Sequence, residues 1–347
     1  MFNELLQTVS VSIATVRSIL QTNDRLRKIL FAQDHVTRQI LEENKEFKSL
    51  LDVAPTETEW LVCDHCAAVT RLYAIYERFV EDLISDWLRF LPELFSRYSD
   101  LGEKVKNTHR EGVGRLLLDL NKNRFQHLSV DKVVQGLFSG ITDTEKYTLL
   151  PEAFLLHEQN LRKEVIEKIF QDAGIENAWK WVINHREIKN FVEEIRGSQN
   201  TAEGELKQLI DYRNEAAHGS VDEILGTQKL LDLGYFVEAL CKALAELVTY
   251  QVLERKALIG NAKEIGTITE WFKKPGAAVA KVRKSTLSVG GSLWLVSESS
   301  SYCQLATIES IQIKDIPNAQ VEIISETEVG LKFDTDARIG LSLYLIE

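Results

Sequence analysis

The chain has 347 residues, 44% of them hydrophobic and 27% charged, which is an ordinary globular composition and enough length for two domains. A formal net charge of −11 argues against a broad, sequence-independent nucleic-acid binder, although it permits an enzyme with one local basic site. The segment 1–20 contains an acidic residue and interrupted apolar positions, so we expect neither a signal peptide nor a membrane span. Four cysteines do not form a disulfide framework, which favours the reducing cytoplasm.

From the start to about residue 256, the apolar spacing predicts helices almost throughout. The clearest run is residues 57–91, where apolar residues recur at helical spacing and charged pairs occupy the other face. Further helices are predicted near residues 2–20, 24–50, 113–122, 150–172, 176–196, 201–218 and 230–256. The segment EGVGR, residues 111–115, lacks the features of a phosphate-binding loop and is predicted to start a helix. We therefore expect a large all-α bundle as a domain over residues 1–258.

Two features of this helical part are ambiguous. In CDHC, residues 63–66, there is no second cysteine pair at zinc-finger spacing, so we predict core packing for the cysteines, His65 on the helix surface, and no metal. Near residues 180–196 the basic side chains of Lys180, Arg186 and Lys189 fall on one helical stretch, together with His185 and Arg196. They are candidates for RNA binding, and a solvated helix face is the alternative.

The segment DYRNEAAHGS, residues 211–220, is predicted to end a helix, because Gly219 is suited to the left-handed position after a last turn. Arg213 and His218 are five residues apart, so on a straight helix they differ by about 140° in azimuth. At the helix end, the ring of His218 is free to swing back toward the arginine. An imidazole is suited to proton transfer near neutral pH, and a guanidinium is suited to a phosphate oxygen that gains charge.

Those two groups suffice for RNA cleavage by internal attack. A base removes the proton of the ribose 2′-OH, the oxygen attacks the adjacent phosphorus, and a cation stabilises the charge that develops. We expect no metal or other cofactor. Because one histidine cannot easily serve as both base and acid, we expect a two-fold homodimer that brings two such motifs to one groove.

After residue 264 the character of the sequence changes. Seven short runs rich in Val, Ile, Thr and Ser alternate with Gly or Asn turns, which predicts strands. So many short strands in about 80 residues favour a small closed β-barrel, since closure removes exposed edges. We therefore predict a second domain over residues 264–347.

RNEAAHG resembles the motif of helical ribonucleases of the HEPN superfamily, in which an arginine, a polar residue and then a histidine end a late helix. The resemblance implies a metal-independent endoribonuclease that acts as a homodimer and leaves a 2′,3′-cyclic phosphate. Arg213 would stabilise the phosphate, His218 would transfer protons, and Asn214 would position one of them. The pair Tyr76–Glu77 resembles an early-helix feature of the superfamily, and Glu77 is expected to face the arginine or, alternatively, to lie plainly at the surface.

The segment 264–347 resembles the second domain of elongation factor Tu and related translation factors. The likeness runs in order through ITEWFKKPGAAVAKV, LSVGGSLWL, ATIESIQI, ETEVGLKF and ARIGLSLYLI, although two Gly-Asp turns of that pattern read Gly290-Gly291 and Gly340-Leu341 here. It implies docking on tRNA or a ribosome. A protein-binding, dimer-stabilising or purely structural barrel is the alternative.

Together these features predict an endoribonuclease that cleaves tRNA or another translation-associated RNA. The expected setting is a bacterial toxin or phage-defence system, in which an antitoxin or a defence protein would be a partner. The alternative is a non-catalytic HEPN adaptor that binds RNA, the ribosome or a protein through the barrel.

Overall fold

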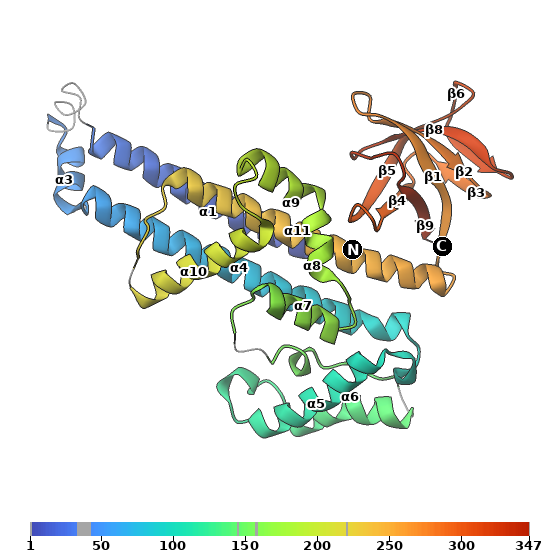
Figure 1. The fold of residues 1–347 in the computed structure, drawn as a ribbon, viewed down its shortest axis with the longest axis horizontal. Helices are drawn as coiled ribbons and strands as arrows, with labels where there is room; N and C mark the ends of the chain where they lie inside the picture. Colours follow the sequence, from blue (N-terminus) through green and yellow to red (C-terminus); the bar gives the residue numbers. More distant parts are fainter. Residues whose placement is uncertain (1, 33–42, 144–145, 157–158, 220, 347) are drawn as a thin grey trace.

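The computed structural model describes residues 2–32, 43–143, 146–156, 159–219 and 221–346. Within these ranges, ten α-helices precede nine strands (Figure 1). The helices are α1 (Asn3–Leu30), α3 (Lys45–Val53), α4 (Glu57–Leu94), α5 (Glu103–Asp119), α6 (Val130–Thr142), α7 (Lys163–Asp172), α8 (Ala178–Asn184), α9 (Arg186–Asn190), α10 (Ala202–His218) and α11 (Thr227–Leu258). The strands are β1 (Ala262–Phe272), β2 (Ala277–Val282), β3 (Ser285–Ser288), β4 (Ser292–Ser297), β5 (Tyr302–Ile313), β6 (Ile316–Asn318), β7 (Gln320–Ile323), β8 (Thr327–Phe333) and β9 (Ser342–Ile346). An α-helical region followed by a β-barrel is thus the architecture predicted from the sequence.

Three long helices, α1, α4 and α11, pack side by side along the long axis of the molecule (Figure 1). The sequence around Thr56 starts α4 with a capping box, in which Thr56 and Glu59 satisfy each other's backbone N–H groups. One face of α4 is buried from Asp64 to Leu94, as its apolar spacing predicts. Much of α11 is buried because α1 and α4 contact it on one side while α8 and α9 contact it on another. This layer is the floor on which α10 lies.

Helix α10 packs across α4 just before the chain turns into α11. It begins where the hydroxyl of Thr201 accepts a hydrogen bond from the N–H of Gly204. It ends at Gly219, whose φ of 75° is left-handed, so the predicted glycine stop is confirmed. The sequence motif of residues 213–218 therefore occupies the last turns of this helix.

Helices α5 and α6 pack against each other in a separate layer (Figure 1), in which α5 contacts α7 and the 3-10 helix at Pro151–Ala153, and both helices differ from the prediction. Gly112 lies inside α5 rather than near a helix start, and a Cβ atom there would come within 2.0 Å of the carbonyl oxygen of Ala153. Helix α6 was not predicted because Gly140 resembles a helix breaker. Its glycines instead permit close packing, since a Cβ on Gly136 would meet Thr148 and one on Gly140 would meet the ring of Tyr98.

Six strands close the barrel in the order β4-β9-β1-β2-β8-β5, with β5 pairing back to β4. All of these pairings are antiparallel. The closed barrel was predicted, but the short strands β3 and β6 were not. The likeness to the translation-factor domain remains a prediction, because the barrel topology alone does not test it.

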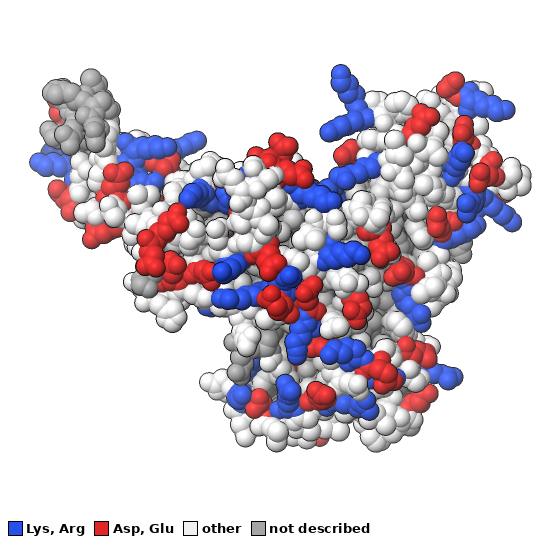
Figure 2. Space-filling view, in the orientation of Figure 1, with Lys and Arg blue, Asp and Glu red and all other residues white. Residues whose placement is uncertain are grey.

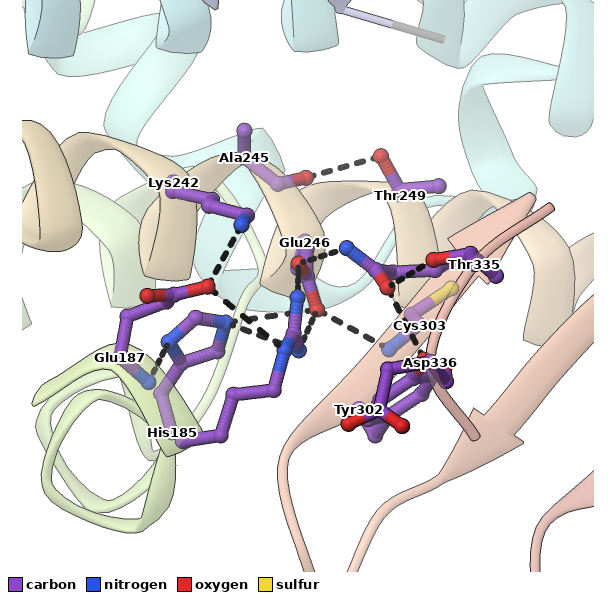
Figure 3. A network of polar contacts seen from close by, with 12 residues as sticks. His185, Glu187, Lys242, Ala245, Glu246, Thr249, Tyr302, Cys303, Thr335 and Asp336 are labelled. Carbon is purple, nitrogen blue, oxygen red and sulfur yellow. Dashed lines mark hydrogen bonds and ion pairs between the residues drawn. The ribbon is translucent and has the colours of Figure 1, made fainter. Parts of the chain in front are cut away.

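The barrel is packed onto the end of α11. Trp294, Val296 and Cys303 from the barrel belong to the same buried cluster as the helical core. At this joint the carboxylate of Glu246 accepts two hydrogen bonds from Arg186, at 2.6 and 2.9 Å, and one at 3.2 Å from the backbone N–H of Cys303 (Figure 3). The side-chain amide of Gln304 donates a further hydrogen bond to it.

His185 and Arg186 have a structural role in this joint. The Nδ1 atom of His185 accepts from the backbone N–H of Glu187, which leaves Nε2 to donate toward Glu246 at 3.3 Å. Arg186 also lies over the ring of Tyr302, at 4.5 Å from its centre. Because Arg186 is only 12% exposed and fully paired, it is not a surface group available to RNA, contrary to the prediction for this residue.

Substitution of Gly112 by Ala should lower the free energy of unfolding by about 1–3 kcal/mol, because the added methyl group displaces Ala153. Gly114 is the matched control, since it lies in the same helix with open space around it. Gly114→Ala should raise the free energy of unfolding by up to about 1 kcal/mol through helix propensity. Urea denaturation of both variants measures the contrast, and equal effects would contradict the packing of α5.

Substitution of Glu246 by Gln should lower the free energy of unfolding by about 3–5 kcal/mol, because it leaves Arg186 buried without its charge partner. Glu187→Gln is the matched control. Its ion pair with Lys242 is more than one-third exposed on both sides, so its loss should cost about 1 kcal/mol or less. Thermal and urea unfolding check the difference, and similar losses for both variants would show that the joint does not depend on Glu246.

The contribution of Glu246 should also depend on pH. Burial alone would raise the pKa of this carboxyl group, but hydrogen bonds from Arg186 and His185 lower it to about 2. A carboxyl group whose pKa is lower in the folded than in the unfolded chain stabilises the fold at a pH above its pKa in the unfolded chain. This stabilisation is lost as the pH falls toward 2. The difference in unfolding free energy between the wild type and Glu246→Gln should therefore shrink from pH 5 to pH 2. A difference that is constant with pH would contradict the lowered pKa.

Candidate active site

The side chain of Arg213 is held by neutral groups. Its Nη1 donates a hydrogen bond of 3.1 Å to Oδ1 of Asn214, and its guanidinium lies over the ring of Tyr73, at 4.9 Å from the centre. The same oxygen of Asn214 accepts a 3.1 Å hydrogen bond from Asn160, in the segment before α7. No ion pair joins Arg213 to a carboxylate among the described residues. Its orientation is thus determined while its charge stays available to an anion.

Tyr73 connects three parts of the site. Its hydroxyl donates to Glu77 Oε1 at 2.9 Å and accepts from the backbone N–H of Leu161 at 3.0 Å, while Tyr76 donates to the carbonyl of Leu161. Burial raises the pKa of both tyrosines, so both phenols remain protonated donors. The tyrosine that contacts Arg213 is therefore Tyr73 on α4 and not its neighbour Tyr76.

Arg213 and Glu77 line one side of a cleft of about 1150 Å³. Residues of α4 line it as well, together with Arg124, Phe125 and His127 and with described residues in the ranges 151–155 and 159–162. Its lining is mostly polar and includes Glu77, Arg78, Glu81, Asp82, Ser85, Arg89, Arg124, Phe125, His127, Pro151, Glu152, Leu155, Gln159, Asn160, Arg162 and Arg213. Glu77 therefore shares a cleft with Arg213, although the two side chains form no ion pair within the described part of the chain.

His218 lies apart from this cleft. It is exposed at the last residue of α10, and it is not among the residues that line the cleft. Five residues of helix place it about 7.5 Å further along the axis than Arg213 and about 140° around it. Within one copy of the chain, the two motif residues thus occupy the same helix end without touching.

His65 is buried, not exposed as the sequence analysis expected. Its Nδ1 accepts a 3.1 Å hydrogen bond from the backbone N–H of Leu225, and its ring packs edge-on against Tyr212 at 5.7 Å. Burial lowers the pKa of this histidine, which favours the neutral ring. His65 thereby ties the connection between α10 and α11 to α4. Because Leu225 and Tyr212 are far from His65 in sequence, no local pattern in the sequence predicted this role.

The basic residues predicted near 180–196 do not form one surface patch. Lys180 and Lys189 are exposed, on α8 and α9 respectively, but Arg186 belongs to the barrel joint. Arg196 forms ion pairs with Glu205 at 2.8 Å and Asp232 at 3.0 Å, so it holds helices together. An RNA contact from Lys180 or Lys189 remains a prediction.

Three further residues that line the cleft with Arg213 were not predicted from the sequence. Arg124 lies in a short 3-10 helix at Asn123–Phe125, His127 follows that helix, and Glu152 lies in another at Pro151–Ala153. The Nε2 atom of His127 is 3.0 Å from Oε1 of Glu152. These residues lie outside long helices and share no sequence motif, so only the fold brings them to Arg213.

Among the described residues, no group of three or more His, Cys, Asp or Glu side chains is arranged to hold a metal ion. No helix in that part of the chain is long and apolar enough to span a bilayer.

Comparison with known proteins identifies the helical part. A family model described as RiboL-PSP-HEPN matches residues 34–250, which is more than half of the chain and includes the α10 motif. The matched region ends before the barrel. No curated protein and no solved structure matches the chain. The predicted HEPN resemblance is therefore confirmed, and the chain belongs to the RiboL-PSP-HEPN family.

Proposed function

We propose that the chain is a metal-independent endoribonuclease. The observation that carries the proposal is the state of Arg213. Its guanidinium is oriented by Asn214 and Tyr73, lines a large polar cleft, and has no carboxylate partner among the residues that the structure describes. A phosphate oxygen that gains charge in a transition state is the group such a guanidinium stabilises. Membership of a HEPN family supports an RNA-related role.

The proposed reaction is internal transfer at the phosphodiester. His218 removes the 2′-OH proton, the 2′-oxygen attacks phosphorus, and the bond to the 5′-oxygen breaks as that oxygen takes up a proton. The products are a 2′,3′-cyclic phosphate and a 5′-OH. Asn214 keeps Arg213 in position, as its hydrogen bond indicates. Glu77 has an indirect role, since it holds the hydroxyl of Tyr73 beneath the arginine.

A homodimer is part of this proposal. In one copy of the chain, His218 is exposed and lies outside the cleft, so a partner surface can cover it. Two helix ends that face each other would bring a second histidine to the scissile phosphate, which separates the roles of base and acid. Translation-associated RNA such as tRNA is the proposed substrate, and a toxin or phage-defence system is the proposed setting.

The barrel and the helices are proposed as two domains, residues 264–347 and 1–258, with the barrel docking the nuclease on RNA or the ribosome. The separation of His218 from the cleft also favours a second candidate function, a non-catalytic adaptor that binds RNA or a protein through the barrel.

Purified protein incubated with tRNA in EDTA should cleave it and leave cyclic phosphate ends. His218→Ala should lower the rate by about 10²–10⁴-fold, and Arg213→Ala by about 10²–10³-fold. Arg71→Ala, on the exposed face of α4 and outside the cleft, should cleave like the wild type. Gel analysis of the products measures all four proteins.

Circular dichroism shows whether each variant is folded. An inert wild type at high enzyme concentration, or equal cleavage by the wild type, His218→Ala and Arg213→Ala, would contradict the ribonuclease and favour the adaptor.

A further inference from the structure

The cleft beside Arg213 differs from an ordinary small-molecule pocket. Its volume of about 1150 Å³ exceeds the usual 300–1000 Å³, and charged and polar side chains dominate its lining where small-molecule pockets are mostly apolar. Five arginines line it, namely Arg78, Arg89, Arg124, Arg162 and Arg213. Size and polarity together fit an extended, charged ligand.

Most of the charges in this cleft already have partners. Arg78 pairs with Asp82 at 2.7 Å, Arg89 with Asp86, and Arg162 with Asp211 at 3.4 Å. Glu77 accepts the hydroxyl of Tyr73. The three ion pairs offset the charges of their arginines, so Arg78, Arg89 and Arg162 attract an anion only weakly.

Arg124 and Arg213 are different, because neither has a carboxylate partner among the described residues. Arg124 donates to the carbonyl of Leu155 at 3.0 Å, and its guanidinium lies over the ring of Phe125 at 4.6 Å from the centre. Arg213 is held in the same way by an amide oxygen and a tyrosine ring. The two guanidiniums come from separate elements, α10 and the segment after α5, and line one cleft.

Of the acids that line the cleft, the one nearest to Arg124 in sequence is also paired. Glu152 pairs through Oε1 with His127, and its Oε2 is buried without a hydrogen-bond partner. The side chain of His127 is 59% exposed and that of Glu152 27%, so the imidazole is the more exposed of the two groups.

The net charge of −11 gives the molecule as a whole no attraction for a polyanion. On the face shown in Figure 2, acidic and basic side chains are interleaved over the helices. A polyanion would therefore bind where unpaired guanidiniums converge, and not on the surface at large.

We propose that this cleft binds the backbone of single-stranded RNA, with Arg213 on the reacting phosphate and Arg124 on another phosphate of the same strand. His127, held by Glu152, lies beside Arg124 and hydrogen-bonds the strand. The choice of RNA rests on the proposed ribonuclease function. A flexible single strand can follow the irregular walls of the cleft and stack bases on guanidinium planes, as single-strand sites do.

The test measures RNA binding separately from cleavage. The full chain with His218→Ala is the background, and a labelled single-stranded RNA is titrated by fluorescence anisotropy at several KCl concentrations. Arg124→Ala should weaken binding at least tenfold and reduce the slope of log affinity against log salt by about 0.7, the value for one lost phosphate contact. Arg124→Lys keeps the charge and should keep the slope. Arg71→Ala, the matched control, should change affinity less than twofold.

Equal affinity and slope for Arg124→Ala and Arg71→Ala would overturn the proposal, as would the absence of RNA binding by the background. If Arg124→Ala lost affinity for an acidic peptide but not for RNA, the cleft would be assigned to a protein partner, and the proposal would also be overturned.

The binding result is independent of cleavage. If Arg124→Ala loses affinity for RNA while the wild type never cleaves, the proposed RNA-binding cleft stands and the proposed ribonuclease function fails. If the wild type cleaves and Arg124→Ala binds RNA normally, the ribonuclease function stands and the proposed RNA-binding cleft fails.

Discussion

The hydroxyl and ring of Tyr73 form the contact on which the site depends. The hydroxyl joins α4 to the segment before α7 through Leu161, and it holds Glu77 in place. The ring supports the guanidinium of Arg213 from α10. Three segments far apart in sequence are thus aligned by one buried side chain. Because burial raises the pKa of Tyr73, its phenol stays a protonated donor over the ordinary pH range.

A second buried contact determines where the barrel lies. The carboxylate of Glu246 on α11 is surrounded by donors from α9 and from β5, so the barrel meets the helices through a charged, hydrogen-bonded joint as well as an apolar one (Figure 3). Removing either partner of such a pair is costly because the remaining charge is buried. The barrel is therefore held at a defined position, which any docking role for it requires.

Much of the fold follows from local patterns in the sequence. The period of the apolar residues in 57–91 predicted α4, the glycine after His218 predicted the end of α10, and the clustered short strands predicted a closed barrel. Helix α6 was missed because the glycines that let it pack closely look locally like breakers. Helix α6 is stabilised by Thr148 and Tyr98, which fill the space beside its glycines.

The candidate site was only partly predictable, for the same reason. A motif within one helix, such as residues 213–218, can be recognised from sequence. The burial of His65, the pairing of Arg186 with Glu246, and the approach of Arg124 to the cleft are contacts between distant segments. No periodicity encodes them. A basic residue on a helix is therefore an ambiguous signal until its neighbours in the fold are known.

The central claim is that Arg213 and His218 act on the phosphodiester of an RNA strand. A crystal structure of the protein with RNA carrying 2′-O-methyl groups, which cannot undergo internal attack, tests it most directly. We expect one phosphate within hydrogen-bonding distance of Arg213, with the 2′-oxygen next to it near an imidazole of His218 from either copy. RNA bound elsewhere, with both side chains free of it, would contradict the account.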